Sequence, residues 1–307
     1  MFLKYLLKRL GQTVIVLLLV TVLAFSLIRI APGDPARMVL PDTATDEQIQ
    51  AKRVELGLDK PLVVQYWTYL TDIFHGDLGT SSTYKTAVGG IILNRLPATL
   101  LLTCAAIFVS LCISIPLGIT AGIHQGSLID FVAMFFALVG QSMSTVWLGI
   151  LMIFIFAVKL KWLPALGMEG FKYLILPACT MGYPIAAAVT RLGRSGMVDV
   201  LREDYITTTL AKGIPERTVY TKYAFKNALI PIVTTVGGQF SFFLGGAVVI
   251  ETIFSWSGIG QLTNASVANR DYQMVQSLLL VIAMGVAVVN FLVDIINAKI
   301  DPRITLQ

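Results

Sequence analysis

The sequence has little charge. Asp, Glu, Lys and Arg together make up 13% of its 307 residues, whereas 56% are hydrophobic and the mean hydropathy is +0.77. Soluble domains carry about 25% charged residues. Because so few polar side chains cannot cover a water-soluble globule, the composition excludes that class. It indicates a polytopic membrane protein whose apolar surface faces lipid.

Residues for catalysis and nucleotide binding are also scarce. The 2 histidines, His75 and His124, are expected on opposite faces of the membrane, so we expect no metal site. Cys104 and Cys112 lie about 12 Å apart along one helix, which excludes a disulfide, and with Cys179 they are expected to be buried and apolar. None of the 12 lysines follows a glycine, as a Walker A loop requires. Any ATP and Mg²⁺ would therefore bind to another polypeptide, and this chain is predicted to hold no cofactor and no catalytic residue.

Six apolar runs are long enough to cross a hydrocarbon core of about 30 Å, which needs around 20 helical residues. They predict an all-α protein with six transmembrane helices, over 10–30, 98–122, 129–158, 173–189, 228–250 and 274–296. The first run is longer than a signal-peptide core, so we expect it to be retained. The chain then divides into a flank with the first helix (1–30), an external helical segment (31–95) and a core with five helices (96–307).

The distribution of lysine and arginine predicts the orientation. The N-terminal flank carries Lys4, Lys8 and Arg9 without an acid, and segment 191–226 carries seven bases against four acids. Both are expected on the cytoplasmic side, together with both termini. Segment 31–95, with eight acids against six bases, is placed outside, although three lysines between the third and fourth runs also fall there. The net charge of +5 follows from this topology, so nucleic-acid binding is not needed to explain it.

The external segment is predicted to form two short helices. Thr45 and Gln48 have the spacing of a capping box, and Gly57 can end the helix that they open. A second helix can begin at Pro61, end before Gly76 and bury Val64, Trp67, Tyr69 and Leu70. Two interpretations stay open: a cap that packs on the bundle, and a docking surface for an external partner.

The inner segment, 191–227, is longer than a connection between two spans requires. Residues 197–212 can form an amphipathic helix, with Val198, Leu201, Tyr205 and Thr208 on one side and Arg202, Glu203 and Asp204 exposed. Gly213 can end this helix, and Pro215 can begin another toward the fifth span. Such a structured loop favours the docking of a partner over a solvated connector.

The middles of the spans lack ionisable residues. Arg29, Asp130, Glu251 and Asp294 fall near span ends, where their side chains are expected to reach the interface. Ionisable residues at depth usually mark proton relays or ion pathways. Their absence disfavours a proton-coupled antiporter and a voltage sensor.

Uncharged polar residues do occur at depth. Gln141, Ser142, Ser144, Gln239 and Ser241 are candidates for lining a hydrated pathway, and equally for hydrogen bonds between helices. Glycines spaced by four, as in the pair at 118 and 122, are expected to allow close helix packing.

A series of short motifs runs along nearly the whole chain. They are Ala-Pro-Gly-Asp-Pro (31–35), Leu-Gly-Leu-Asp-Lys-Pro (56–61), Gly-Asp-Leu-Gly (76–79), Leu-Pro-Ala-Thr-Leu (96–100), Glu-Asp-Tyr (203–205), Ala-Lys-Gly (211–213), Asn-Ala-Leu-Ile-Pro (227–231), Gly-Gly-Ala (245–247) with Glu251, Arg-Asp-Tyr (270–272) and Asp-Pro-Arg (301–303). In this order they are specific. The chain resembles the membrane-spanning permease subunits of binding-protein-dependent ABC importers of the dipeptide, oligopeptide and nickel class.

This resemblance implies a non-catalytic subunit of the bacterial or archaeal cytoplasmic membrane, which forms half of a pathway for di- or oligopeptides. The implied partners are a second homologous permease, two ABC ATPase subunits that bind ATP and Mg²⁺, and an extracytoplasmic substrate-binding protein. In the family, an EAA-type loop between the fourth and fifth spans holds a coupling helix that seats in a groove of the ATPase. The candidate coupling residues here are Glu203, Asp204, Tyr205, Ala211, Lys212 and Gly213.

The sequence departs from the family pattern at three places. Thr207-Thr208-Thr209 stands at the EAA position. Ser142-Met143-Ser144 lacks the proline of a Ser-Met-Pro turn, so we expect no proline kink in the third span. The segment 256–261, Trp-Ser-Gly-Ile-Gly-Gln, replaces Trp-Pro-Gly-Leu-Gly-Arg. Its Trp256, Gly258 and Gly260 are candidates for an outer gate.

Alternative functions stay open. The same architecture would serve for nickel, a metal chelate or glutathione, because Trp-Leu-Pro-Ala-Leu-Gly at 162–167 resembles those members as much as the peptide ones. A self-sufficient channel or secondary carrier is the alternative from another class, favoured by the polar positions in the third and fifth spans. A membrane-embedded enzyme would lack a nucleophile paired with a base.

Overall fold

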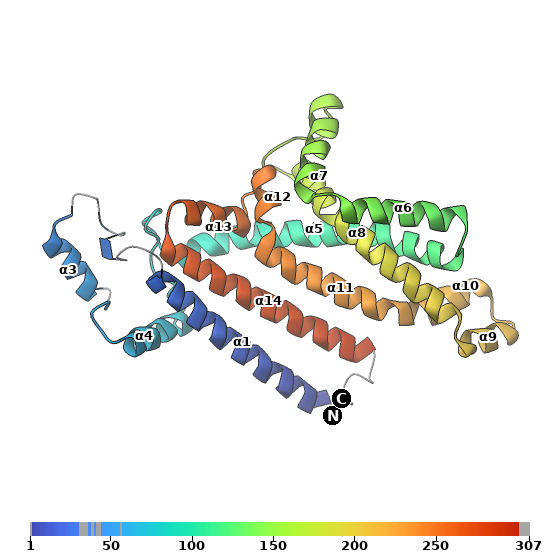
Figure 1. The fold of residues 1–307 in the computed structure, drawn as a ribbon, viewed down its shortest axis with the longest axis horizontal. Coiled ribbons are helices and arrows are strands. Elements are labelled where there is room, and N and C mark those ends of the chain that lie inside the picture. Colours follow the sequence, from blue (N-terminus) through green and yellow to red (C-terminus); the bar gives the residue numbers. More distant parts are fainter. Residues whose placement is uncertain (1, 31–35, 38–39, 41–43, 56, 301–307) are drawn as a thin grey trace.

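The computed structural model describes residues 2–30, 36–37, 40, 44–55 and 57–300, and within them helices dominate (Figure 1). The α-helices with their bounds are α1 (Phe2–Ile30), α3 (Asp46–Glu55), α4 (Leu62–Phe74), α5 (Val88–Ile123), α6 (Leu128–Ser142), α7 (Thr145–Met152), α8 (Phe171–Leu201), α9 (Asp204–Ala211), α10 (Glu216–Thr218), α11 (Phe225–Gly246), α12 (Val248–Ile253), α13 (Ile259–Ala268) and α14 (Tyr272–Ile300). Two π-helical stretches, η1 (Ile153–Lys159) and η2 (Val219–Ala224), continue α7 and α10. The all-α prediction is confirmed.

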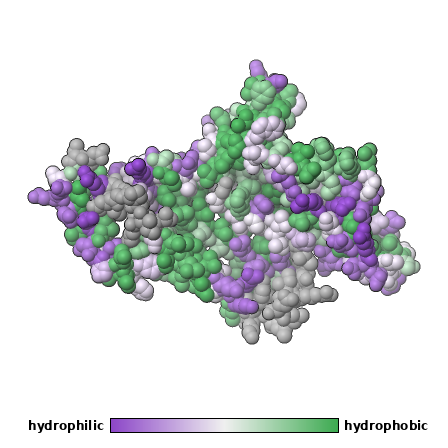
Figure 2. Space-filling view, viewed as in Figure 1, coloured by the Kyte–Doolittle hydropathy of each residue, from purple (hydrophilic) through white to green (hydrophobic). Residues whose placement is uncertain are grey.

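Four described helices, α1, α5, α8 and α14, are long and apolar enough to cross a membrane. Two bent pairs bring the number to six if each pair counts as one span: α6 with α7–η1, and Glu216–Leu229 with Pro231–Gly245, a pair that is bent within α11. The surface agrees with this arrangement, since hydrophobic atoms cover much of the middle of the molecule and hydrophilic atoms gather toward its two ends (Figure 2).

The third apolar run is bent, although it lacks a proline. α6 and the helix beginning at Thr145 differ in direction by 105°. Met143 and Ser144 have extended backbones, with ψ of 133° and 132°. The Ser142 hydroxyl donates to the Leu138 carbonyl at 2.9 Å, a back-bond that competes with the helical ladder and bends helices. The run thus lacks the proline of the family turn but is bent at the same place.

The fourth span is longer than predicted, because α8 continues to Leu201. The chain then turns at Arg202 and Glu203 before α9 begins. The backbone of Glu203 is extended, with a ψ of 142°. The predicted single helix over 197–212 was thus wrong. Its first part belongs to the membrane helix and its last part is separate.

Helices α5 and α8 pack closely through small side chains. α5 has a buried small residue at every fourth position, namely Ala106, Ser110, Ser114, Gly118 and Gly122. A Cβ on Gly182 of α8 would come within 2.6 Å of the Ala106 carbonyl, and one on Gly122 within 2.5 Å of the Met197 Cβ. Small residues let helix backbones approach in this way, which confirms the prediction for the pair at 118 and 122.

Helices α1, α11 and α14 are joined by polar contacts near one end of the bundle. Arg9 of α1 lies 3.3 Å from Asp294 of α14, and Asn297 donates to the Thr234 hydroxyl of α11 at 3.0 Å. α11 begins beside η2, so the start of α1 and the end of α14 lie toward the same end as α9 and α10 (Figure 1).

The external helices begin and end as predicted, but α4 packs differently. The capping box forms, since the Thr45 amide donates to the Gln48 side-chain oxygen at 3.0 Å and the Gln48 amide donates to the Thr45 hydroxyl at 3.4 Å. Gly57 follows α3 with a φ of +66°. In α4, by contrast, Trp67 is 68% exposed and Val64 is 44% exposed, and no residue of the helix is fully buried. The helix buries Tyr66 and Tyr69 only partly, against Phe25 of α1.

One further expectation was wrong, since Cys104 and Cys112 are exposed on α5, on the side of the helix away from α8. Asp130 and Glu251, near span ends, are buried in the protein, with exposed fractions of 5% and 0%. Asp130 is instead held by Arg194 of α8, with 2.7 Å between the Arg194 Nη2 and the Asp130 Oδ2.

Candidate functional site

The inner helix α9 is a short segment between two bends. Glu203 stands before it in an extended conformation, and Gly213 follows it with a φ of +78°, in the left-handed region that glycine adopts without strain. Pro215 then stands immediately before α10 as its N-cap residue, with a ψ of 135°. The predicted bend at Gly213 is confirmed.

A single side chain of α9 is buried. Ile206, 1% exposed, packs into a cluster with Met197 of α8, Val219 and Ala224 of η2, and Ala228 of α11. Tyr205 is 38% exposed, and its hydroxyl accepts a hydrogen bond from Asn227 at 2.7 Å. The other candidate coupling residues, Glu203, Asp204, Ala211, Lys212 and Gly213, are all exposed.

The arrangement leaves most of α9 free to contact another molecule. The hydroxyls of Thr208 and Thr209 bond back to carbonyls of the same helix, at 2.9 and 2.6 Å, so they do not tie it to the bundle. An isolated eight-residue helix is marginal in water. α9 is therefore held in place by Ile206 and by the bends that flank it.

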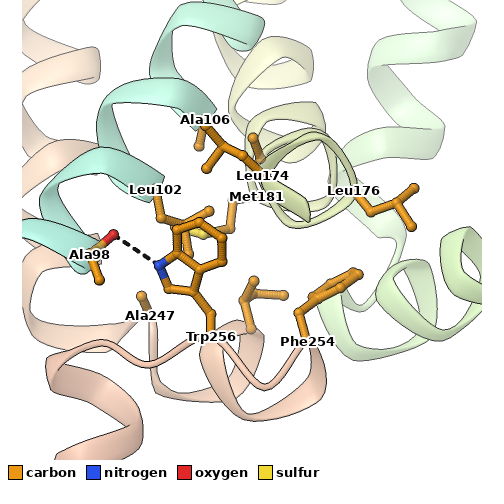
Figure 3. Packing of buried hydrophobic residues seen from close by; sticks show 11 residues of the cluster. Ala98, Leu102, Ala106, Leu174, Leu176, Met181, Ala247, Phe254 and Trp256 are labelled. Atoms are coloured by element: carbon orange, nitrogen blue, oxygen red, sulfur yellow. Dashed lines mark hydrogen bonds between the residues drawn. The ribbon is translucent and has the colours of Figure 1, made fainter. Parts of the chain in front are cut away.

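At the opposite end of the bundle, the candidate gate residue Trp256 is deeply buried. Its exposed fraction is 1%, and its indole nitrogen donates to the Ala98 carbonyl of α5 at 2.9 Å. It packs among Leu102, Leu174 and Met181, with Phe254 beside it (Figure 3). Trp256 thus joins the loop before α13 to α5 and α8.

Gly258 and Gly260 lie where a side chain would not fit. A Cβ on Gly258 would come within 2.2 Å of a Glu251 carboxylate oxygen, and one on Gly260 within 2.7 Å of the Val248 backbone. Glu251 accepts hydrogen bonds from the Thr99 hydroxyl at 2.6 Å and from the Gln261 amide at 2.8 Å. The Thr99 hydroxyl in turn accepts the Ile259 amide at 2.8 Å.

These contacts satisfy the first amides of α13. A carboxylate at a helix N-terminus also interacts favourably with the helix dipole. Glu251 and Thr99 together therefore fix α13 to α12 and α5. We name the residues Thr99, Glu251, Trp256, Gly258 and Gly260 the outer clamp.

A second carboxylate, Asp271, holds the loop before α5. It accepts hydrogen bonds from the Ser81 hydroxyl and from the amides of Thr83, at 3.1 Å, and Met274, at 3.2 Å. Burial by itself would raise the pKa of Asp271, but these hydrogen bonds and one from the Ser82 amide outweigh burial and hold the pKa below its usual value. The side chain is therefore ionised at neutral pH and binds the loop as an anion.

The candidate pathway residues do not form one group. Gln141, Ser142 and Ser144 are exposed at the bend between α6 and α7. Ser241 is buried and donates to the Asn290 side chain of α14 at 2.8 Å, so it links two helices, while Gln239 is half-buried on α11. The sequence left two roles open for Ser241, lining a pathway and hydrogen bonding between helices. The structure shows a hydrogen bond between helices.

Reasoning from the sequence missed Ile206, Thr99 and the internal role of Glu251. Glu251 carries a signal, because it ends an apolar run shortly before Gly-x-Gly, yet only the folded chain brings Thr99 to it. Ile206 lies among threonines and has no distinctive pattern. Among the described residues no group of three or more His, Cys, Asp or Glu side chains could hold a metal ion.

The fold and this site define a multi-pass helical membrane protein with an exposed helix at its inner end. Residues 114–306 match the family model described as "Binding-protein-dependent transport system inner membrane component", and residues 2–103 match the model for the N-terminal part of such components. The chain belongs to this family.

Curated relatives cover almost the full length. The glutathione transport system permease protein GsiC of Salmonella choleraesuis (strain SC-B67) is 40% identical over 302 residues, which are 98% of this chain and 99% of the relative. GsiC of Pectobacterium atrosepticum is also 40% identical and that of Escherichia coli (strain K12) is 38% identical, with the same coverage. The chain is thus a non-catalytic permease subunit of an ABC importer of the bacterial inner membrane, and the ATPase is a separate chain.

A solved structure shares the fold. It is described as an inward-facing conformation of the MetNI methionine ABC transporter, and one of its chains aligns with a TM-score of 0.57 at 16% identity over 69% of this chain and 96% of that chain. The predicted resemblance to importer permeases is confirmed.

Proposed function

We propose that this permease imports small peptides, including glutathione, which an extracytoplasmic binding protein delivers, and that α9 couples the movement to ATP hydrolysis. The observation that carries the coupling role is the exposure of α9, whose described contacts with the bundle are the buried Ile206 and the hydrogen bond between Tyr205 and Asn227. A helix with so few contacts to its own chain has most of its surface available to bind in a groove of a partner. Glu203, Asp204, Tyr205, Ala211, Lys212 and Gly213 form its contact surface.

The substrate proposal rests on the relatives. Full-length relatives at 38–40% identity are named glutathione transport permeases, and glutathione is itself a tripeptide. Nickel alone is less well supported, because these relatives are named for glutathione. A separate binding protein selects the solute, so the pathway through this chain needs no tight binding site.

The assembly is proposed to contain a second, homologous permease and two ATPase subunits, with this chain forming half of the pathway. When ATP closes the ATPases, α9 moves with them. The Ile206 cluster joins α9 to the inner ends of α5, α8 and α11, so the movement reaches the spans as a rigid-body change. The outer clamp and the exposed residues Gln141, Ser142 and Ser144 are proposed to lie along the route that opens and closes.

The coupling role is tested with the double variant Glu203→Lys, Gly213→Leu in the complete importer. We expect uptake to fall while ATP hydrolysis continues and the subunit still inserts and assembles. The matched control is Glu169→Lys, Gly126→Leu, because Glu169 is also exposed and Gly126 has the same φ of +78° in the turn between α5 and α6. Unchanged uptake in the coupling variant, or equal loss in both variants, would contradict the proposal.

The substrate is tested by uptake of labelled glutathione, a dipeptide and Ni²⁺ into vesicles that hold the purified importer. Glutathione and the peptide are expected to accumulate only with ATP and the binding protein. Vesicles with this chain alone serve as the control. Solute flux through them without the ATPases would establish the self-sufficient carrier instead.

A further inference from the structure

Helix α4 presents an apolar surface that no described residue covers. Three of its large hydrophobic side chains are strongly exposed: Phe74 is 84% exposed, Val63 is 80% exposed and Trp67 is 68% exposed. The helix lies outside the spans, beside the outer end of α1 (Figure 1). In a water-exposed segment, a continuous apolar row of this kind marks an interaction surface.

The residues of α4 fall on three faces of the helix at 3.6 residues per turn. The half-buried face consists of Tyr66, Tyr69 and Ile73; the exposed apolar face consists of Val63, Trp67 and Phe74; the polar face consists of Gln65, Thr68 and Asp72. One face thus meets the protein, one is polar, and the apolar face lies between them. A helix with this division lies along a boundary between water and an apolar phase.

Contacts with α1 place α4 at the depth of such a boundary. The Tyr66 hydroxyl lies 2.9 Å from the Thr21 hydroxyl, and the Tyr66 and Phe25 rings are 5.2 Å apart. The apolar span of α1 ends at Ser26, five residues after Thr21 and therefore about 7.5 Å further along the axis. Interfacial helices bury their apolar face about 5–10 Å into the boundary between headgroups and acyl chains.

We propose that α4 is a membrane-surface helix of the outer leaflet, with Val63, Trp67 and Phe74 inserted among the lipids. The same end of α1 also exposes apolar side chains, since Val22 is 45% exposed and Leu23 is 66% exposed. Tryptophan and tyrosine are also enriched at this level of the bilayer. The external segment is thereby anchored in the membrane at α4, which is neither a cap on the bundle nor a docking surface for a soluble protein.

The test uses spin labels on the complete importer in lipid nanodiscs. In a chain with Cys104, Cys112 and Cys179 replaced by alanine, and with cysteine-free partner subunits, single cysteines are introduced by V63C, W67C, F74C, T68C and D72C. At positions 63, 67 and 74 the label is expected to collide several-fold more often with oxygen, which dissolves in lipid, than with a water-soluble nickel chelate. At positions 68 and 72 the order is expected to reverse.

Two results would overturn the proposal. Access of the nickel chelate at 63, 67 and 74 would place α4 in water, and exclusion of both reagents there would show that a protein covers the face. A second measurement avoids cysteines. The emission of Trp67 is obtained by subtracting the fluorescence of the Trp67→Phe variant from that of the native importer. Lipids with brominated acyl chains should quench this emission. Unquenched emission would also contradict the proposal. Neither result depends on which solute is carried.

Discussion

The two ends of the molecule are stabilised in opposite ways. At the inner end, α9 buries one side chain of eight residues and leaves its polar and charged surface exposed. At the outer end, the clamp residues Trp256 and Glu251 are 1% and 0% exposed and are hydrogen-bonded to α5. The outer clamp is thus satisfied by contacts within this chain, whereas the exposed surface of α9 is proposed to contact a partner. The following predictions test this difference.

The largest effect is expected for Gly258→Ala. The new Cβ would lie 2.2 Å from the Glu251 carboxylate and 2.4 Å from the Thr99 hydroxyl, so the clamp must open. Overpacking of a filled site costs about 1–3 kcal/mol or more, and here it also breaks the cap of α13. We expect a lower melting temperature for the purified importer and loss of uptake. Gly238→Ala is the control, because no described atom lies within 4 Å of its Cβ position. Equal stability of the two variants would refute the prediction.

A large effect of another kind is expected for Ile206→Ala. Removing a fully buried isoleucine side chain costs about 2–5 kcal/mol, here in the local anchoring of α9. The melting temperature of the bundle should therefore change little, while uptake falls and ATP hydrolysis no longer responds to the loaded binding protein. Ile15→Ala shortens an isoleucine that is 59% exposed on α1 and should leave both activities intact. Normal coupling in Ile206→Ala would show that α9 has further anchors.

A moderate effect is expected for Asp271→Asn. An amide cannot replace the anion that accepts hydrogen bonds from Ser81 and the backbone amides, and an unsatisfied buried group costs about 1–3 kcal/mol. Since the pKa of Asp271 is lowered by folding, its stabilisation is full above the ordinary value near 4 and is lost as pH falls through the lowered value. At pH 7, a protease should therefore cleave loop 76–87 faster in the variant than in the native protein. Asp59→Asn, an exposed change, should leave cleavage as in the native chain.

The smallest effect is expected for Ser241→Ala. Its hydrogen bond to Asn290 joins α11 and α14, and a hydrogen bond between membrane helices contributes about 0.6 kcal/mol on average. Uptake should stay close to the native rate, with a slight fall in melting temperature. A severe loss of uptake with normal stability would instead place Ser241 on the pathway.

The sequence predicts much of this fold, because apolar runs of about 20 residues specify membrane helices directly. The capping box at Thr45 and the bend at Gly213 follow from equally local chemistry. The prediction was wrong where tertiary contacts decide the outcome, since α8 extends to Leu201 on its packing with α5. The bend of the third run at Ser144 has no proline to announce it in the sequence. In the site, exposure of the coupling residues agrees with the sequence, but the contact of Glu251 with Thr99, 152 positions earlier, depends on the folded chain.

Helix α8 connects the two ends of the molecule. Leu174, near its start, packs against the cluster around Trp256, and Met197, near its end, packs against Ile206. At 1.5 Å per residue, its 31 residues form a strut of about 46 Å. Small residues seat α8 against α5 from Gly182 to Met197, although Pro177 and Pro184 also lie within the helix. We therefore expect a movement of α9 to reach the outer face as a tilt of α8.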